Sequence, residues 1–203
     1  MWALFSMLII RQVVRAIAPE PGTALVLARE LCMFVAAGVL LWVVSRGEHL
    51  PLRSVGIGTA PLWKSLLWGA VICVACLAPA VAIALVTGYG KGPSSQGFAK
   101  LPLWLVFLTV VRAGVVEELF YRGYAIERMR LLGAGKYLSW GIPLMVFAGG
   151  HWTGGLANIG IALVLGGVLT GFYLWKRDLV ANMFGHFLVD FVTNVLPALF
   201  GAK

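Results

Sequence analysis

Long apolar segments alternate with short polar connections along the whole chain. About 20 apolar residues are the length that an α-helix needs to cross a bilayer. We therefore expect helical spans at 24–44, 65–86, 101–126, 137–152, 154–175 and 178–200, of which 137–152 is short. Residues 1–22 mix apolar and basic positions and end in prolines, a pattern that predicts an amphipathic or irregular N-terminal helix.

Composition supports a membrane protein. Hydrophobic residues make up 61% of the 203 residues, charged residues make up 12%, and the mean hydropathy is +0.93. This length allows one bundle of about six to eight helices and no soluble domain beside it. The predicted fold is therefore all-α, a polytopic transmembrane helix bundle that forms a single integral-membrane domain over residues 1–203.

The net charge of +8 would suggest a nucleic-acid partner in a soluble protein. Here the basic residues fall mostly between apolar segments, as the positive-inside rule requires of cytoplasmic loops. The connections 46–64, 127–136 and 176–177 are expected on one, cytoplasmic, side. We therefore expect membrane lipid and a membrane-associated peptide or protein as partners, and no nucleic acid. The compact, loop-poor chain favours a bacterial cell membrane.

Charged residues within 101–126 form the sequence Glu117-Glu118-x-x-x-Arg122. An ionised side chain at the bilayer centre costs roughly 2.5–3.5 kcal/mol or more, so such a cluster indicates function. Glu118 and Arg122 have the spacing and order of a helical ion pair. Successive helical residues point about 100° apart, so Glu117 faces elsewhere and needs partners from other helices.

A second group of polar residues lies in two of the later apolar segments, 137–152 and 178–200. His151 ends the segment 137–152, and four polar residues spaced four apart form a stripe along 178–200: Asn182, His186, Asp190 and Asn194. At about 1.5 Å of rise per residue, Glu117, His151, His186 and Asp190 reach similar depths in their helices. We predict that these four side chains converge on one cavity.

Other residues in the apolar segments suggest simpler roles. Arg29 and Glu30, near the start of 24–44, are expected at the membrane interface, and Arg112 receives no role. Phe147 is expected to pack against the helix that carries the glutamates. Four glycines in 154–175 are expected to allow close helix packing: Gly160, Gly166, Gly167 and Gly171.

Two kinds of chemistry fit these residues. Glu117 with a histidine could deprotonate a water molecule, while a second histidine with Asp190 or Asn182 steadies a carbonyl oxyanion. Alternatively, Glu117, His151, His186 and Asp190 could hold a divalent metal such as zinc. The chain lacks His-Glu-x-x-His, which disfavours the zincin type of metal site.

Three motifs occur in order on successive apolar segments: Glu117-Glu118-x-x-x-Arg122, Phe147-x-x-x-His151 and His186-x-x-x-Asp190. They resemble the motifs of the CAAX-protease and bacteriocin-processing (CPBP, or Abi) family, which includes the type II CAAX prenyl endopeptidases. The resemblance covers roughly residues 100–200. It implies an all-helical intramembrane endopeptidase with its catalytic core at 101–200.

The resemblance also implies residue roles. Glu117 and His151 would activate water, His186 and Asp190 would stabilise the oxyanion, and Glu118 and Arg122 would support them. Eukaryotic CAAX enzymes have asparagine at the position of Asp190. An ionised aspartate cannot donate to an oxyanion, so Asp190 would be protonated, bind a metal or orient His186 by a hydrogen bond, and dependence on a metal stays open.

Two other functions remain as alternatives. The same fold could serve as a non-catalytic membrane scaffold or bacteriocin-immunity protein. Acids and histidines in the middle of the membrane also occur in the proton relays of transporters, so a proton-coupled transporter is the third hypothesis. The chain shows no internal repeat of the kind common in transporters, which argues against a transporter.

Overall fold

A computed structural model of the chain describes residues 2–18, 22–88 and 101–200, and the regular elements in these ranges are all helices. The α-helices are α1 (Trp2–Ile17), α2 (Thr23–Trp42), α3 (Leu62–Thr87), α4 (Leu103–Arg112), α5 (Glu127–Leu131), α6 (Lys136–Gly149), α7 (Gly155–Lys176), α8 (Leu179–Asp190) and α9 (Leu196–Leu199). Segments of π-helix follow several of them: η1 (Val43–Gly47), η4 (Ala113–Glu117), η5 (Leu119–Ile126) and η7 (Phe191–Val195). Short 3₁₀ turns form η2 (Leu52–Val55) and η6 (Trp152–Gly154). The predicted all-α fold is confirmed.

Four helical stretches are long and apolar enough to cross a membrane: Thr23–Gly47, Leu62–Thr87, Trp152–Lys176 and Leu179–Leu199. They match four of the predicted spans to within a few residues. The predicted span 101–126 is part of one unbroken helical rod that runs from α4 through η4 and η5 to α5. Helix α6 has 14 residues and is therefore about 21 Å long, shorter than the apolar thickness of a bilayer.

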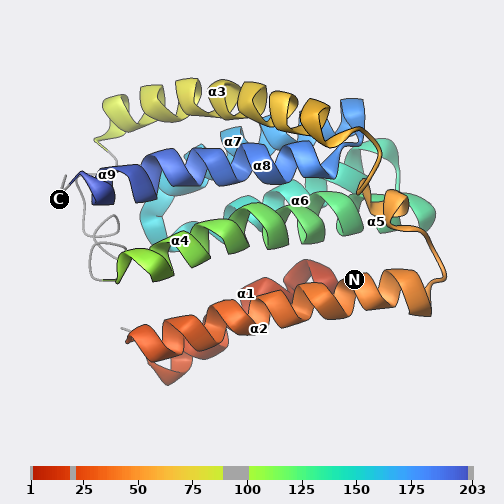
Figure 1. Cartoon of the computed structure of the whole chain (residues 1–203), viewed down its shortest axis with the longest axis horizontal. Coiled ribbons are helices and arrows are strands. Elements are labelled where there is room, and N and C mark those ends of the chain that lie inside the picture. Colours follow the sequence, from red (N-terminus) through yellow and green to blue (C-terminus); the bar gives the residue numbers. More distant parts are fainter. Residues whose placement is uncertain (1, 19–21, 89–100, 201–203) are drawn as a thin grey trace.

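The helices form one bundle, with α3 and α8 packed side by side and α7 and α6 beside them (Figure 1). The hairpin of α1 and α2 lies on the other side of α4. Large apolar side chains remain exposed on the outer faces of the helices, among them Leu31, Val35, Val74 and Leu156. Such a surface suits contact with lipid chains rather than with water.

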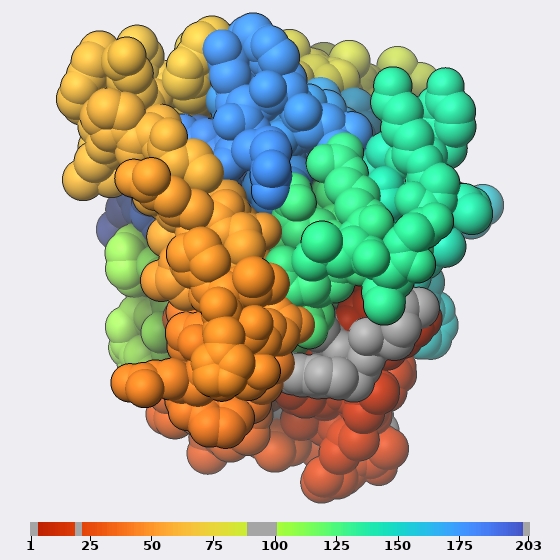
Figure 2. Space-filling model, turned by 90° about the vertical axis from the view of Figure 1, so that its right-hand side faces the viewer, coloured from red at the N-terminus to blue at the C-terminus, as the bar shows by residue number. Residues whose placement is uncertain are grey.

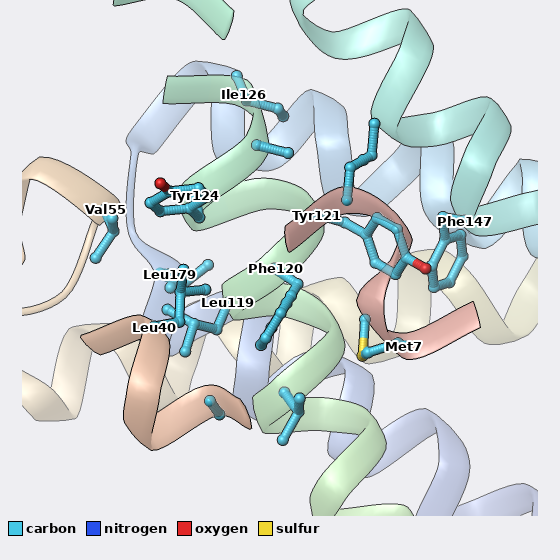
Figure 3. Packing of buried hydrophobic residues seen from close by; sticks show 14 of the residues in the cluster. Met7, Leu40, Val55, Leu119, Phe120, Tyr121, Tyr124, Ile126, Phe147 and Leu179 are labelled. Atoms are coloured by element: carbon cyan, nitrogen blue, oxygen red, sulfur yellow. The ribbon is translucent and has the colours of Figure 1, made fainter. Parts of the chain in front are cut away.

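Residues of η5 stand at the centre of the largest apolar cluster. Leu119, Phe120 and Ile126 are completely or almost completely buried there. Figure 3 shows these residues together with Tyr121, whose ring lies edge-on to the ring of Phe147 at a centroid distance of 5.4 Å. The packing expected of Phe147 is confirmed.

Helix α1 belongs to this packing. Its residues Leu4 and Met7 are buried in the same apolar cluster, and Met7 lies close to Tyr121 and Phe147 in Figure 3. The N-terminal segment was predicted to be an amphipathic or an irregular helix. In the structure Trp2–Ile17 is one regular α-helix. Its buried face points to the core of the bundle, so α1 is part of the bundle.

The basic connections meet at one end of the bundle, as predicted. Arg128 pairs with Glu48 at 2.6 Å, and Arg177 pairs with Glu127 at 2.7 Å. Leu179 donates its backbone N–H to the carbonyl of Gly56, which ties the chain before α3 to the start of α8. Figure 2 looks onto this end, where the orange chain before α3 lies beside the blue turn between α7 and α8.

Candidate active site

A close contact between η4 and α8 brings the two glutamates next to the stripe of polar residues. A Cβ atom on Gly114 would lie 2.8 Å from the carbonyl oxygen of Met183 and 2.9 Å from the Cβ of Phe187. Only glycine lets the two backbones approach this far without a shift. Because Gly114 lies one turn before Glu117 and Glu118, and Phe187 follows His186, this contact sets the distance between acid and histidine.

Glu118 is fully buried and hydrogen-bonded through both oxygens. Its Oε1 accepts from Arg122 Nη1 at 2.6 Å and lies 2.8 Å from His186 Nδ1. Its Oε2 accepts from Asn182 Nδ2 at 3.1 Å. The predicted Glu118–Arg122 ion pair is confirmed, and the same carboxylate also anchors α8.

Arg122 is held by α7 in addition. Its Nη2 donates to the carbonyl of Gly166 at 3.2 Å, and its Nε lies 3.4 Å from the hydroxyl of Thr170. Its guanidinium carbon lies 4.3 Å from the centroid of the Phe147 ring, a cation–π contact. Together with the bond from Nη1 to Glu118, these contacts hold all three nitrogens of the guanidinium.

The close packing predicted for the glycines of α7 holds at one position. A Cβ on Gly166 would lie 2.7 Å from Leu144 and 3.1 Å from the guanidinium of Arg122. The prediction was wrong for the other three glycines, which have open space where a Cβ would be: Gly160, Gly167 and Gly171. Gly166 faces the interior of the bundle, whereas those three do not.

Glu117 is also buried, but its partners differ. Its Oε1 accepts from Arg112 Nη1 and from Arg11 Nη2. The described residues place no hydrogen-bond donor on its second oxygen, Oε2. Glu117 was expected to find its partners on other helices. This is confirmed for Arg11, which lies on α1. It was wrong for Arg112, which lies on the same helical rod as Glu117.

The π-helical geometry of η4 explains the Arg112 contact. In an α-helix, residues five apart point about 140° away from each other. In a π-helix the hydrogen bonds join residues five apart, which brings such residues onto one face. Arg112 directly precedes η4 and Glu117 ends it, so the two side chains meet.

Arg112 is paired on its other side with Glu30 of α2. Its Nε donates to Glu30 Oε2 at 2.6 Å, and Glu30 is fully buried. Arg29 in turn lies 2.6 Å from Glu30 Oε1. Glu30 is therefore the internal partner of an arginine to which the sequence had assigned no role, and its expected place at the membrane interface stays a prediction.

Both histidine rings lie near the ring of Phe147. The His151 ring centroid is 4.9 Å from that of Phe147, and the His186 centroid is 6.2 Å from it. His151 Nδ1 lies 2.8 Å from the carbonyl oxygen of Phe147. Since a carbonyl only accepts, Nδ1 carries the proton and Nε2 of His151 keeps a free lone pair.

Asp190 does not hydrogen-bond to His186. Its Oδ2 lies 3.7 Å from His186 Nε2, beyond hydrogen-bonding distance, and its side chain is 26% exposed. The prediction that Asp190 orients the His186 ring by a hydrogen bond was wrong, since Glu118 does this from the other ring nitrogen. Asn194, the last residue of the predicted stripe, bonds to the backbone of its own helix.

The predicted residues nevertheless share one region of the bundle. The Glu117 carboxylate interacts electrostatically with His151 and His186, and Asp190 interacts with His186 and Glu117. Arg112 and Arg11 complete the set of charges around them. A buried acid, two histidines and a partly exposed acid are therefore within reach of each other's charge.

Residues 99–192 match the sequence model of a known family, described as type II CAAX prenyl endopeptidase Rce1-like. This segment, just under half of the chain, is similar to the Rce1-like family. The match confirms the resemblance seen in the motifs. No curated protein and no solved structure is significantly similar to the chain.

The Rce1-like segment contains all the residues predicted for the site, namely Glu117, Glu118, Arg122, His151, His186 and Asp190. It does not contain Arg11, Arg29 or Glu30, which the structure adds. The sequence carried one signal for these residues. Each is a charge within or beside an apolar helix, where an unpaired charge is costly.

The side chains predicted as metal ligands do not come together around one point. In the ranges 2–18, 22–88 and 101–200, no three His, Cys, Asp or Glu side chains lie close enough to share a metal ion. Two guanidinium groups occupy Glu117 Oε1, and Glu118 occupies His186 Nδ1. The predicted ligands Glu117, His151, His186 and Asp190 therefore do not form a metal-binding set in this arrangement.

Proposed function

We propose that the chain is an intramembrane endopeptidase that hydrolyses a peptide bond of a membrane-associated peptide or protein with an activated water. The Rce1-like match and the apolar helices support this proposal. The observation that carries this proposal is the unequal bonding of the two carboxylate oxygens of Glu117. Its Oε1 is held by two arginines while Oε2 has no donor among the described residues, in reach of two histidines.

Glu117 and His151 are the groups proposed to activate water. A water that donates one hydrogen to Glu117 Oε2 and the other to the free lone pair of His151 Nε2 directs its oxygen towards a substrate carbonyl. Glu117 takes a proton as the new C–O bond forms. The same proton then passes to the amide nitrogen, the C–N bond breaks, and the products are a carboxylic acid and an amine.

His186 is proposed to stabilise the oxyanion. Both of its ring nitrogens face carboxylates, Glu118 at 2.8 Å from Nδ1 and Asp190 at 3.7 Å from Nε2. Two neighbouring acids stabilise the imidazolium, whose Nε2–H can donate to the developing oxyanion. Asp190 thus contributes negative charge, and Glu118 with Arg122 positions the ring.

The test uses the full chain reconstituted in lipid nanodiscs, a library of peptides with one apolar anchor, and H₂¹⁸O as solvent. Hydrolysis by activated water places one ¹⁸O in the new C-terminal carboxyl group, which mass spectrometry detects. Cleavage is expected to persist in the presence of a chelator. If the chelator stops cleavage and zinc restores it, the mechanism is metal-based and this proposal is wrong in that part.

The same cleavage assay, together with a proton-flux measurement on the full chain in sealed lipid vesicles, separates the alternative functions. A chain that cleaves no peptide but carries protons across the vesicle membrane is a transporter, and one that does neither is a scaffold or immunity protein. Either outcome overturns the proposed endopeptidase.

A further inference from the structure

Arg11 reaches the candidate site from a helix outside the Rce1-like segment. Helix α1 is fixed along the edge of the site, with Leu4 and Met7 buried in the core and Leu8 against Gly150. From this position Arg11 extends to Glu117, and its Nη2 lies 2.5 Å from Oε1. The contact joins residues 106 apart in the sequence.

The charges show that Arg11 does more than neutralise a buried acid. The linked chain of ion pairs runs from Arg29 through Glu30 and Arg112 to Glu117. These two acids and two arginines already balance within this chain of direct pairs, so Arg11 is a further cation at Glu117, and its charge also acts on Asp190. The Arg11 side chain is 24% exposed, so it is less deeply buried than Glu117.

The geometry gives this further cation a specific effect. Arg112 and Arg11 approach the same oxygen of Glu117 from two helices, so together they hold the carboxylate in one orientation. Arg112 is itself fixed by Glu30. With Oε1 held from both sides, Oε2 is the oxygen that remains available to a water.

We propose that Arg11 is a positioning residue for Glu117, so that α1 completes an active site whose other residues lie within 99–192. The inference rests on the proposed function, because it assigns Glu117 the role of general base. Arg11 acts on substrate only through Glu117. Loss of Arg11 leaves the base present and paired with Arg112, but no longer held in the orientation that faces the water.

The test compares the variants Arg11→Gln, Arg11→Lys and Arg15→Gln in the full chain, in nanodiscs and at equal amounts of folded protein. Arg15 is the matched control, since it lies one turn later on α1 and contacts the Trp152 ring rather than an acid. Arg11→Gln is expected to lower kcat by about 100-fold, the cost of displacing a catalytic group by about 1 Å, and to leave KM near the wild-type value. Arg11→Lys keeps a charge and a donor and should recover part of kcat, whereas Arg15→Gln should match wild type.

A second measurement tests the contact without relying on turnover. Thermal unfolding is followed for Arg11→Gln, Glu117→Gln and the double variant. If the two side chains interact, the shift in Tm of the double variant differs from the sum of the single shifts, because both single variants break the same contact. Additive shifts overturn the inference.

The outcomes separate this inference from the proposed function. If Arg11→Gln and Arg15→Gln both cleave like wild type while Glu117→Gln is inactive, Arg11 has no positioning role and the endopeptidase stands. The positioning role of Arg11 is also overturned if Arg11→Gln loses activity with a raised KM and Arg11→Lys recovers none of that activity. A wild type that hydrolyses no peptide overturns the proposed function and this role with it.

Discussion

Glu117 and Glu118 are neighbours in sequence, both are buried, and each is paired with arginine, yet their surroundings differ. Glu118 bonds through both oxygens to residues of its own rod and of α8. Within the part of the chain that the structure describes, Glu117 bonds through one oxygen only, to Arg112 and to Arg11 of α1. A buried acid whose oxygens are all occupied holds helices together, whereas one with a free oxygen can still exchange a proton.

The comparison shows how one helix combines support and chemistry. Successive side chains on a helix point in different directions, so adjacent acids reach different neighbours. Glu118 faces α8, where Asn182 and His186 meet it beside Arg122 of its own rod. Glu117 faces α1 and α2. Substitutions that treat the two acids alike should therefore have different effects.

The largest expected effect is on turnover by Glu117→Gln. An amide cannot take the proton of water, so kcat should fall by roughly 10²–10⁴-fold. Peptide hydrolysis in nanodiscs measures it, and Glu48→Gln is the matched control, because Glu48 pairs with Arg128 at the basic end of the bundle. A Glu117→Gln variant as active as Glu48→Gln would remove Glu117 from the chemistry.

Glu118→Gln should lower the stability of the folded protein more than Glu117→Gln does. Of the acids that the structure describes, Glu118 alone forms an ion pair with Arg122, so its loss leaves a buried arginine uncompensated. Breaking a buried pair in this way costs about 3–5 kcal/mol. Thermal unfolding in detergent should show a lower Tm for Glu118→Gln than for Glu117→Gln, where Arg112 keeps Glu30. The reverse order would contradict the division of roles.

Gly114→Ala tests the contact that holds both acids beside α8. The added Cβ would meet the Met183 carbonyl, a backbone atom that cannot turn aside. Overpacking of this kind costs about 1–3 kcal/mol, and the shift of η4 should also lower kcat. Gly167→Ala is the control, since its Cβ meets open space in α7. Equal Tm and activity in the two variants would show that the close approach is not needed.

Asp190→Asn should have the smallest effect of these substitutions. Asp190 is partly exposed and beyond hydrogen-bonding distance of His186, which Glu118 holds instead. An amide there can itself donate to an oxyanion, so kcat should fall far less than in Glu117→Gln. An inactive Asp190→Asn variant beside an active Glu117→Gln variant would reverse the assignment of the general base.

Local pattern was sufficient for much of this protein. Runs of apolar residues predicted the spans at 24–44, 65–86, 154–175 and 178–200, because the length of an apolar helix depends on the chain itself. The spacing of Glu118 and Arg122 predicted their ion pair, because residues four apart on a helix are neighbours wherever the helix packs. The same motifs predicted the Rce1-like family.

The partners of Glu117 were decided by tertiary structure. The Arg112 contact depends on the π-helical segment η4, which changes the residues that share a face and which no apolar periodicity reveals. The Arg11 contact depends on where α1 docks, and the burial of Glu30 depends on where α2 meets α4. The anchor of His186 was likewise chosen by packing. Asp190 has the helical spacing for a bond but stays 3.7 Å from Nε2, whereas Gly114 brings η4 close enough to α8 for Glu118 to bond the ring at its other nitrogen, Nδ1.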